Sequence, residues 1–358
     1  MAHKPLVHLI IPQLFQPLKR WGKGYLFEVH SPYLTTLLQG YSSKYQSSAN
    51  GINASLFASL DIPTQDELPV AHYRYQAHCH SVPPKDSLLL CADPVHLVVG
   101  MSDITLTDKI TDLTTAEANE LIDLLNTHFK QDGLTFTIGS NSQWYLSSSK
   151  MESLSTTPLD NVLKENIAHH PIQSDQRNWQ ALQNEIQMLL HSAPLNQYRE
   201  TVGLPTVNSL WLWGGGERIN VKQRPSIILS DNAVSGGMLA IAGKCSYQQF
   251  LDKQSTTTLG AIDDTALAEF DFSAHLKGKL IIINESLVES AINDDPEAYQ
   301  KELKRLEECL FKPLSALWKD KKITIQIDSC GGKLIEPQHT SRWKFWKKRL
   351  NSLSELSL

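Results

Sequence analysis

The sequence predicts an α/β protein, in which a sheet flanked by helices is interrupted by an inserted α+β subdomain. Residues 7–11 and 279–284 are continuous apolar, β-branched runs, typical of strands buried on both faces of a parallel sheet. Strands and helices alternate from 206 to 330. Residues 70–149 instead show short strands around one helix. The predicted domains are a core of 1–69 and 150–340, an insertion of 70–149 and a C-terminal helix at 341–358.

Composition restricts the function classes. The chain has 358 residues and a formal net charge of −5, which gives no global attraction to nucleic acid or anionic lipid. The first apolar run ends at Pro12 and is too short for a signal peptide, and no run is long enough for a membrane span. Five cysteines without CxxC spacing argue against disulfides or a zinc knuckle. We expect a cytoplasmic protein.

The first part of the core begins with the strand at 7–11. Residues 31–60 are predicted to be rich in helix, with a polar, serine-rich interruption at 42–53. Residues 63–69, which begin and end with proline, are predicted to be a linker.

Within the insertion, residues 87–91 and 95–99 are predicted as two strands separated by Asp93-Pro94. The helix that follows begins at a capping box formed by Thr114 and Glu117, and further strands are predicted at 134–138 and 144–146. His78 and His80, if on a strand, would share one face with Cys91 nearby and could bind a metal. Half-buried strand histidines are the commoner alternative, so no metal site is assigned.

The second part of the core starts with an amphipathic helix at 176–192. Residues 208–217, Asn-Ser-Leu-Trp-Leu-Trp-Gly-Gly-Gly-Glu, follow as a buried strand that ends in three glycines. Glycines without side chains let the backbone approach a ligand, or another part of the fold, very closely. The remaining elements are strands at 226–229, 279–284 and 323–327, and a long helix that Asp295-Pro296 begins.

A candidate ligand pocket surrounds the glycines. It comprises Arg199, Asn208, Trp211, Trp213, Gly214, Gly215, Gly216 and Asp328. Arg199 could hold a phosphate or carboxylate with two hydrogen bonds. The alternative is an ion pair with Glu200 or Glu185 that fixes the loop. The glycine-rich run at 237–244 does not have the spacing of a phosphate-binding loop.

The C-terminal segment is a candidate interaction surface. Basic and aromatic residues alternate there on a predicted amphipathic helix, and the candidate contacts are Arg342, Trp343, Trp346, Lys347 and Arg349. This helix could bind a partner protein, an anionic membrane surface or nucleic acid, or pack on its own domain with its lysine stems along apolar surface. Docking on a partner or on its own domain is favoured, since one short helix anchors weakly to a membrane.

A family resemblance rests on residues 190–216. A helix is followed there by Asn196, Arg199, a Gly-Leu-Pro run at 203–205, Asn208 and a strand that ends in glycines. This order resembles the cofactor-independent phosphoglycerate mutases of the archaeal type. The chain is still more similar to a bacterial branch known as RpfE-type regulatory proteins, through residues 93–97, 103–106, 128–134, 184–191 and the C-terminal segment.

The resemblance implies the alkaline-phosphatase fold, with two divalent metals and a serine nucleophile. The chain departs from that pattern where the metal ligands are expected: Gln13 follows the first strand, no histidine lies between Asn284 and His339, and Ser329 follows Asp328. Asp328 is the single ligand position that carries over. Ser47, Ser48, Ser55 and Ser59 are equivalent candidates for the nucleophile.

We therefore expect a non-catalytic, phosphoglycerate-mutase-like regulatory or interaction protein that binds a protein partner and needs no cofactor. One alternative is a mutase or related phosphotransferase with a rearranged site around Asp328, Arg199 and residues 214–216, which would use a divalent metal such as manganese. Another is a sensor that binds a phosphorylated small molecule.

Overall fold

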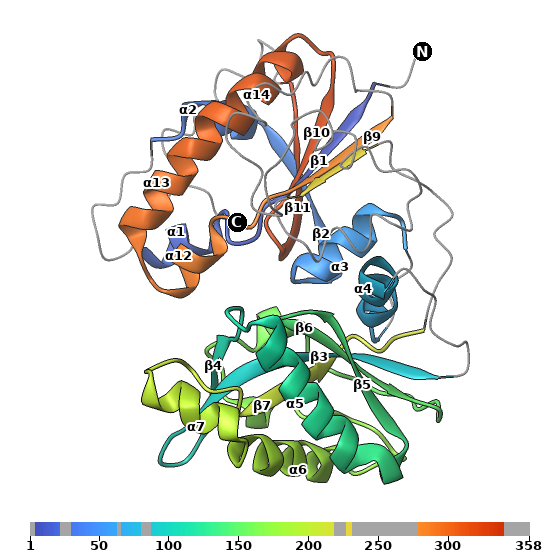
Figure 1. The fold of residues 1–358 in the computed structure, drawn as a ribbon. Helices are drawn as coiled ribbons and strands as arrows, with labels where there is room; N and C mark the ends of the chain where they lie inside the picture. Colours follow the sequence, from blue (N-terminus) through green and yellow to red (C-terminus); the bar gives the residue numbers. More distant parts are fainter. Residues whose placement is uncertain are drawn as a thin grey trace. The chain divides into compact units, whose positions relative to one another are not determined.

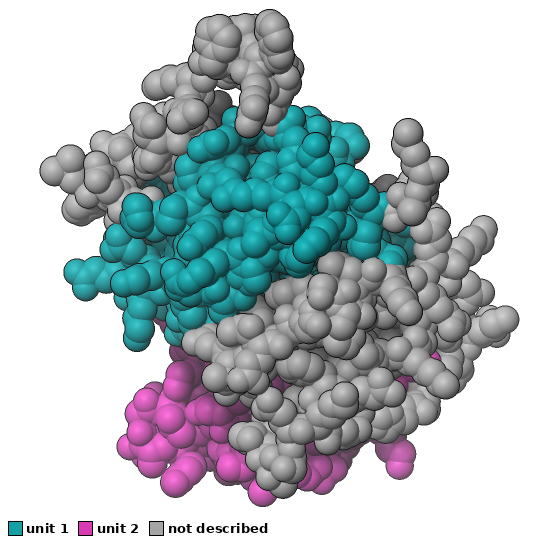
Figure 2. Space-filling view, turned by 90° about the horizontal axis from the view of Figure 1, so that it is seen from above, with its two compact units in different colours: residues 1–64, 221–358 teal, residues 65–220 magenta. Residues whose placement is uncertain are grey.

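The computed structural model describes residues 4–21, 30–62, 66–79, 87–217, 227–230 and 278–339. The chain forms two compact units (Figure 2). Unit 1 comprises residues 1–64 and 221–358, and unit 2 comprises residues 65–220. The predicted α/β class is confirmed, because each unit combines a sheet with helices (Figure 1).

Unit 1 contains a six-stranded sheet in the order β2-β11-β10-β1-β9-β8. Its strands are β1 (Leu6–Ile10), β2 (Tyr41–Asn50), β8 (Ile227–Ser230), β9 (Lys279–Ile283), β10 (Thr324–Asp328) and β11 (Gly331–Pro337). β1 pairs in parallel with both β10 and β9, and β8 continues the parallel set. β11 and β2 extend the sheet antiparallel. The apolar run at the N-terminus is therefore a central parallel strand, as predicted.

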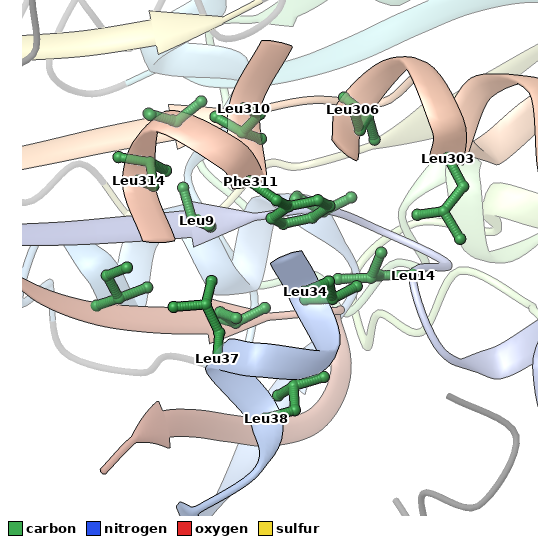
Figure 3. Packing of buried hydrophobic residues seen from close by; sticks show 14 of the residues in the cluster. Leu9, Leu14, Leu34, Leu37, Leu38, Leu303, Leu306, Leu310, Phe311 and Leu314 are labelled. Atoms are coloured by element: carbon green, nitrogen blue, oxygen red, sulfur yellow. The ribbon is translucent and has the colours of Figure 1, made fainter. Parts of the chain in front are cut away.

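The helices of unit 1 cover the sheet and create its main core. Those in the described part of the unit are α1 (Gln16–Trp21), α2 (Pro32–Leu38), α3 (Ile52–Ser59), α12 (Val288–Ile292), α13 (Pro296–Leu306), the π-helix η4 (Glu307–Phe311) and α14 (Lys312–Lys319). Alternate residues of the strands, such as Leu9, point to one face and pack against α2, α13, η4 and α14 (Figure 3). The intervening residues, which include His8 and Asp328, belong to the opposite face, and α3 contacts β1 and β2.

Unit 2 is built on a five-stranded sheet with the order β4-β3-β6-β5, in which β7 also pairs with β3. Its strands are β3 (Leu88–Val99), β4 (Ile104–Lys109), β5 (Leu134–Ser140), β6 (Gln143–Ser148) and β7 (Ser209–Trp213). Its helices are α4 (Val70–Cys79), α5 (Thr115–His128), η1 (Phe129–Asp132), η2 (Leu159–Asn161), η3 (Ile167–His169), α6 (Trp179–His191) and α7 (Pro194–Thr201).

The boundary of unit 2 differs from the predicted insertion of 70–149. β7 pairs antiparallel with β3 from Cys91↔Trp213 to Val95↔Ser209, and residues of α6 share one buried cluster with α5, β5 and β6. Residues 150–220 therefore belong to unit 2 rather than to the α/β core, because their apolar faces complete its sheet and its core.

Three local predictions also need correction. The serine-rich interruption at 42–53 is mostly the strand β2, which pairs with β11 at the edge of the sheet. The two strands predicted at 87–91 and 95–99 form one continuous strand, β3. Residues 70–79 form a helix instead of a strand, so His78 does not lie on the strand that the metal hypothesis required, and His80 lies outside the described residues.

Candidate functional site

The three glycines at the end of β7 contact the chain's own segment 66–71. A Cβ atom on Gly216 would lie 2.0 Å from the carbonyl oxygen of Glu67, and one on Gly214 would lie 3.1 Å from Cβ of Val70. Ala71 N–H donates to the carbonyl of Gly214 at 2.9 Å. Of the two interpretations of the glycines, the structure favours close approach of another part of the fold.

Glu67 uses the backbone donors of this turn. Its Oε1 accepts hydrogen bonds from the N–H groups of Gly214 and Gly215 at 2.9 and 3.1 Å. Its Oε2 accepts the N–H of Thr156 at 2.7 Å. Burial raises the pKa of Glu67, and these hydrogen bonds oppose that rise. The donors that an anionic ligand would need at the glycine turn thus already bind a carboxylate of the same unit.

The two tryptophans of β7 have different hydrogen-bond partners. The indole N–H of Trp213 donates to Asp93 Oδ2 at 2.8 Å, and that of Trp211 donates to the carbonyl of Thr157 at 2.8 Å. Asp93 also accepts two hydrogen bonds from Arg74, at 2.7 and 2.9 Å. Burial disfavours the charge of Arg74, but the adjacent Asp93 raises its pKa overall. Trp213 therefore completes a buried, charge-balanced cluster.

Arg199 is fully buried, and each of its three guanidinium nitrogens donates a hydrogen bond. Nε donates to the carbonyl of Pro205 at 2.9 Å, Nη1 to Glu117 at 3.1 Å and Nη2 to Asp112 at 2.6 Å. The structure therefore favours the ion-pair interpretation, with different partners from those expected. Glu117 also completes the predicted capping box of α5, so Arg199 fastens α7 to the start of that helix.

Asn208 joins β7 to β3. Its side-chain oxygen accepts the N–H of Leu97 at 2.7 Å, and its amide donates to the carbonyl of Leu97 at 2.8 Å. This side chain acts as an additional rung of the sheet, which satisfies both of its polar atoms.

Asp328 belongs to unit 1, at the carboxyl end of β10. Its Oδ1 accepts the N–H of Cys330 at 2.8 Å, whereas its buried Oδ2 has no hydrogen-bond partner among the described residues. Burial raises the pKa of Asp328, and the nearby Ser55 on α3 partly offsets that rise. Ser55 is buried, and its Oγ forms no hydrogen bond of normal geometry with the described groups. The structure thus places Ser55, one of the four candidate serines, beside Asp328.

Two amide side chains lie at the same edge of the sheet. Asn284 follows β9 and accepts a hydrogen bond from the hydroxyl of Ser286 at 2.7 Å. Gln16 donates to the carbonyl of Ser329 at 2.6 Å. In the part of the chain that the structure describes, no group of three or more His, Cys, Asp or Glu side chains is arranged to hold a metal. These residues do not fit the two-metal site that the family resemblance implies.

His8, on the same face of β1 as Ile10, is a buried polar group that the sequence did not single out. Its side chain is 2% exposed, and neither ring nitrogen has a hydrogen-bond partner among the described residues. Burial, followed by the positive charge of Lys279, lowers the pKa of His8 to about 3. In the sequence, a lone histidine in an apolar run looks the same whether its ring is buried without hydrogen-bond partners or occupies an ordinary strand position.

The predicted C-terminal surface of Arg342, Trp343, Trp346, Lys347 and Arg349 lies outside the described residues, as does the glycine-rich run at 237–244. Among the helices that the structure does describe, none has the length and apolar character needed to cross a membrane.

Comparisons with known proteins support the fold. No protein-family model matches the chain, and no curated protein matches it. The PH0037 protein from Pyrococcus horikoshii is 12% identical, with a TM-score of 0.54 over 96% of this chain and 89% of that one. A cofactor-independent phosphoglycerate mutase from Thermoplasma acidophilum DSM 1728 is 13% identical over 99% of this chain and 96% of that one, with a TM-score of 0.44. The first likeness shows a shared fold alone, and the second is too distant to carry an argument.

Proposed function

We propose that this protein is a non-catalytic, phosphoglycerate-mutase-like regulatory or interaction protein that acts in the cytoplasm by binding a protein partner. The observation that carries the proposal is the state of Arg199. This arginine is the residue of the mutase-like segment best suited to hold a phosphate, and it is buried against Asp112 and Glu117. To bind a phosphorylated substrate, Arg199 must first leave the carboxylates of Asp112 and Glu117. Its guanidinium is fully buried, whereas the Asp112 side chain is 47% exposed, so the cost comes mainly from leaving the buried guanidinium without its partners.

The glycine turn supports the same proposal. The N–H groups of Gly214 and Gly215 already donate to Glu67. A substrate anion at this turn has to displace the Glu67 carboxylate, which belongs to the same unit. The substrate loses translational and rotational entropy when it binds, whereas Glu67 does not. The mutase-like segment therefore serves the internal structure of unit 2 in two independent places.

The edge of the unit 1 sheet supports the loss of metal-dependent chemistry. Next to Asp328 the amide of Gln16 binds the carbonyl of Ser329, and Asn284 follows β9, on the other side of β1. Divalent cations that activate a nucleophile need several charged or imidazole ligands. A divalent metal such as manganese belongs to the catalytic alternative, and no catalytic step is assigned to it here.

The partner surface that we propose is the basic, aromatic segment around Trp343 and Trp346. Its composition suits a protein groove that accepts an amphipathic helix, and nucleic acid is its less favoured target. The test compares the full chain, a chain that ends at residue 340 and a Trp343→Ala, Trp346→Ala variant in quantitative affinity purification. One protein that is enriched by the full chain and lost from both variants supports the proposal, whereas equal recovery by all three contradicts this surface.

The catalytic question needs a separate experiment. Interconversion of 2- and 3-phosphoglycerate is followed by phosphorus NMR with manganese and the full chain, with Asp328→Asn as the control. We expect no turnover above that control, and no manganese retained after gel filtration. Turnover that Asp328→Asn abolishes would overturn the proposal.

The rearranged enzyme is favoured by one observation, which is the position of Ser55 beside Asp328. If this alternative holds, Ser55→Ala removes turnover while the melting temperature stays unchanged. The sensor alternative predicts that 3-phosphoglycerate raises the melting temperature, and that Arg199→Lys abolishes this rise.

A further inference from the structure

Charge is distributed unevenly between the two units. Unit 2 contains 9 Lys and Arg against 18 Asp and Glu, whereas unit 1 contains 24 Lys and Arg against 20 Asp and Glu. The net charge of −5 is therefore the sum of an acidic unit 2 and a unit 1 in which positive charge is in excess. A local excess of charge selects partners of the opposite sign even when the whole chain is acidic.

Part of this excess gathers where α14 ends and β10 begins. Lys321 and Lys322 occupy the turn after α14, and both are exposed. The exposed Lys4 lies at the same end of the sheet, because the carbonyl of the adjacent Pro5 accepts a hydrogen bond from the N–H of Thr324 at 2.9 Å. We call Lys4, Lys321 and Lys322 the basic patch.

His339 lies against the basic patch. Its ring stacks on that of Trp318, with ring centroids 4.2 Å apart and 10° between the ring planes. The N–H of Lys321 donates to the carbonyl of Trp318 at 2.9 Å. Burial, followed by the positive charges of Lys321 and Lys4, lowers the pKa of His339. Two ammonium groups from distant parts of the chain therefore act on the same ring.

Most of the charge of the patch is not neutralised by the described part of the chain. There, Lys4 and Lys321 form no ion pair, and Lys322 pairs with Asp320 at 3.2 Å. Both side chains of that pair are exposed, so water weakens their attraction. The positive charge of the patch is thus available to an anion.

The end of α14 explains this arrangement only in part. Cations near the last carbonyls of a helix are favourable, which accounts for Lys321 and Lys322 but not for Lys4. Lys321 also has φ of +59°, a left-handed conformation that favours glycine or asparagine. A lysine in this disfavoured conformation points to a use for its side chain.

The surroundings of the patch favour an acidic protein segment over a lipid surface or nucleic acid. Among the described residues, the large apolar side chains that are exposed all belong to unit 2, so the patch has no such side chain to insert among lipids. Trp318 is buried and its ring is stacked with His339, so it is not available to stack on a base.

We propose that the basic patch binds an acidic segment of the partner protein. The sequence that follows the patch supports this chemistry, because residues 337–354 contain five Lys and Arg and no Asp or Glu. Complementary charge speeds the association of two proteins and excludes partners of the wrong sign. This inference rests on the proposed function, since it assigns a chemistry to the partner protein.

The first test measures the binding of a fluorescent octaglutamate peptide to the full chain by fluorescence anisotropy. We expect saturable binding that weakens as the salt concentration rises. The double variant Lys4→Glu, Lys321→Glu should raise the dissociation constant about tenfold or more. Lys301→Glu, Lys304→Glu is the matched control, because both lysines are exposed on α13 and the change in net charge is the same. Unchanged binding by the patch variant, or an equal loss in both variants, overturns the proposal.

Lys321→Gly separates binding from folding. Glycine suits the left-handed conformation, so the melting temperature should stay equal or rise while the peptide binds more weakly. Equal peptide binding by Lys321→Gly and the wild type contradicts the proposal. A chain that ends at residue 340 distinguishes this inference from the proposed C-terminal surface. Binding that is lost on truncation but kept by the patch variants overturns the inference alone, whereas binding that still depends on Lys4 and Lys321 after truncation supports it.

Two further measurements identify the class of partner. An oligothymidylate and vesicles of phosphatidylglycerol are compared with the peptide, and we expect both to bind more weakly. Tighter binding of either one through Lys4 and Lys321 overturns the assignment to an acidic protein. Because unit 2 is itself acidic, sedimentation velocity tests a second copy of the chain as the partner. An oligomer that Lys4→Glu, Lys321→Glu dissociates would also overturn the proposal.

Discussion

At the residue scale, His8 is a polar group that the fold accommodates at a cost. It is buried on a central strand without a described hydrogen-bond partner, and an unsatisfied buried polar group costs about 1–3 kcal/mol. The neutral ring is the form that folds, because burial and Lys279 both disfavour the charged form.

This state predicts a dependence of stability on pH. The pKa of His8 is about 3 in the folded protein and about 6.5 in an unfolded chain. Between these values the unfolded state binds more protons, so the free energy of unfolding falls as the pH decreases, by up to about 1.4 kcal/mol per pH unit from this group. His8→Leu should remove this part of the slope and should unfold at an equal or higher urea concentration at pH 7.5.

Urea unfolding between pH 4.5 and 7.5 checks this expectation for the wild type, His8→Leu and the control His191→Leu. His191 is exposed at the end of α6, so its variant should follow the wild-type slope. Identical slopes for the wild type and His8→Leu would show that His8 does not control this pH range.

At the element scale, the end of β7 and the segment 66–71 depend on the absence of a side chain at Gly216. A Cβ atom 2.0 Å from the Glu67 carbonyl oxygen cannot be accommodated without moving backbone. That movement would break the hydrogen bond from Gly216 N–H to the carbonyl of Leu68 at 3.3 Å. We expect Gly216→Ala to lower the free energy of unfolding by about 2 kcal/mol or more.

Gly203→Ala provides a matched control. Gly203 has φ of +73°, and a Cβ atom added to it would have no other atom within 4 Å. Its substitution therefore tests backbone strain alone, which costs about 1–2 kcal/mol. Chemical denaturation of both variants separates steric overlap from strain. If Gly216→Ala is as stable as the wild type, the glycines do not serve this contact, and the ligand interpretation regains its basis.

The same elements show what the sequence could and could not predict. The capping box of Thr114 and Glu117, and the start of α13 at Asp295-Pro296, depend on neighbours in the chain, and both were predicted correctly. β2 was missed because it is an edge strand of polar residues, whose partner β11 lies far along the chain. β3 was divided at Pro94 because proline lacks an N–H, yet its carbonyl still accepts a hydrogen bond from Ile110 at 3.0 Å.

Prediction of the candidate site from the sequence was limited in the same way. Residues of the right chemical type were found at Arg199 and Asp328, but their partners Asp112 and Ser55 are distant in sequence. Whether an arginine clamps a ligand or an internal carboxylate depends on such long-range partners. Charge and spacing along one chain do not contain that information.

At the scale of the whole molecule, the chain folds as two units, each with its own sheet and core. The order of buried strands and helices was enough to predict an α/β core with an insertion. The end of the insertion was not predictable, because β7 has the apolar composition of a core strand and only its pairing with β3 assigns it to unit 2.

This assignment predicts which fragment of the chain can fold by itself. A fragment of residues 65–220 contains all the strands of the unit 2 sheet and its buried cluster, including Trp179, Ile186 and Leu212, so we expect cooperative thermal unfolding and dispersed NMR signals. A fragment of residues 70–149 lacks β7 and α6 and exposes their apolar binding faces, so it should aggregate or unfold without cooperativity. Removing residues 206–217 from the larger fragment isolates the contribution of β7, and should abolish the cooperative transition. If residues 70–149 alone unfold cooperatively, β7 and α6 are additions to a smaller, independent domain.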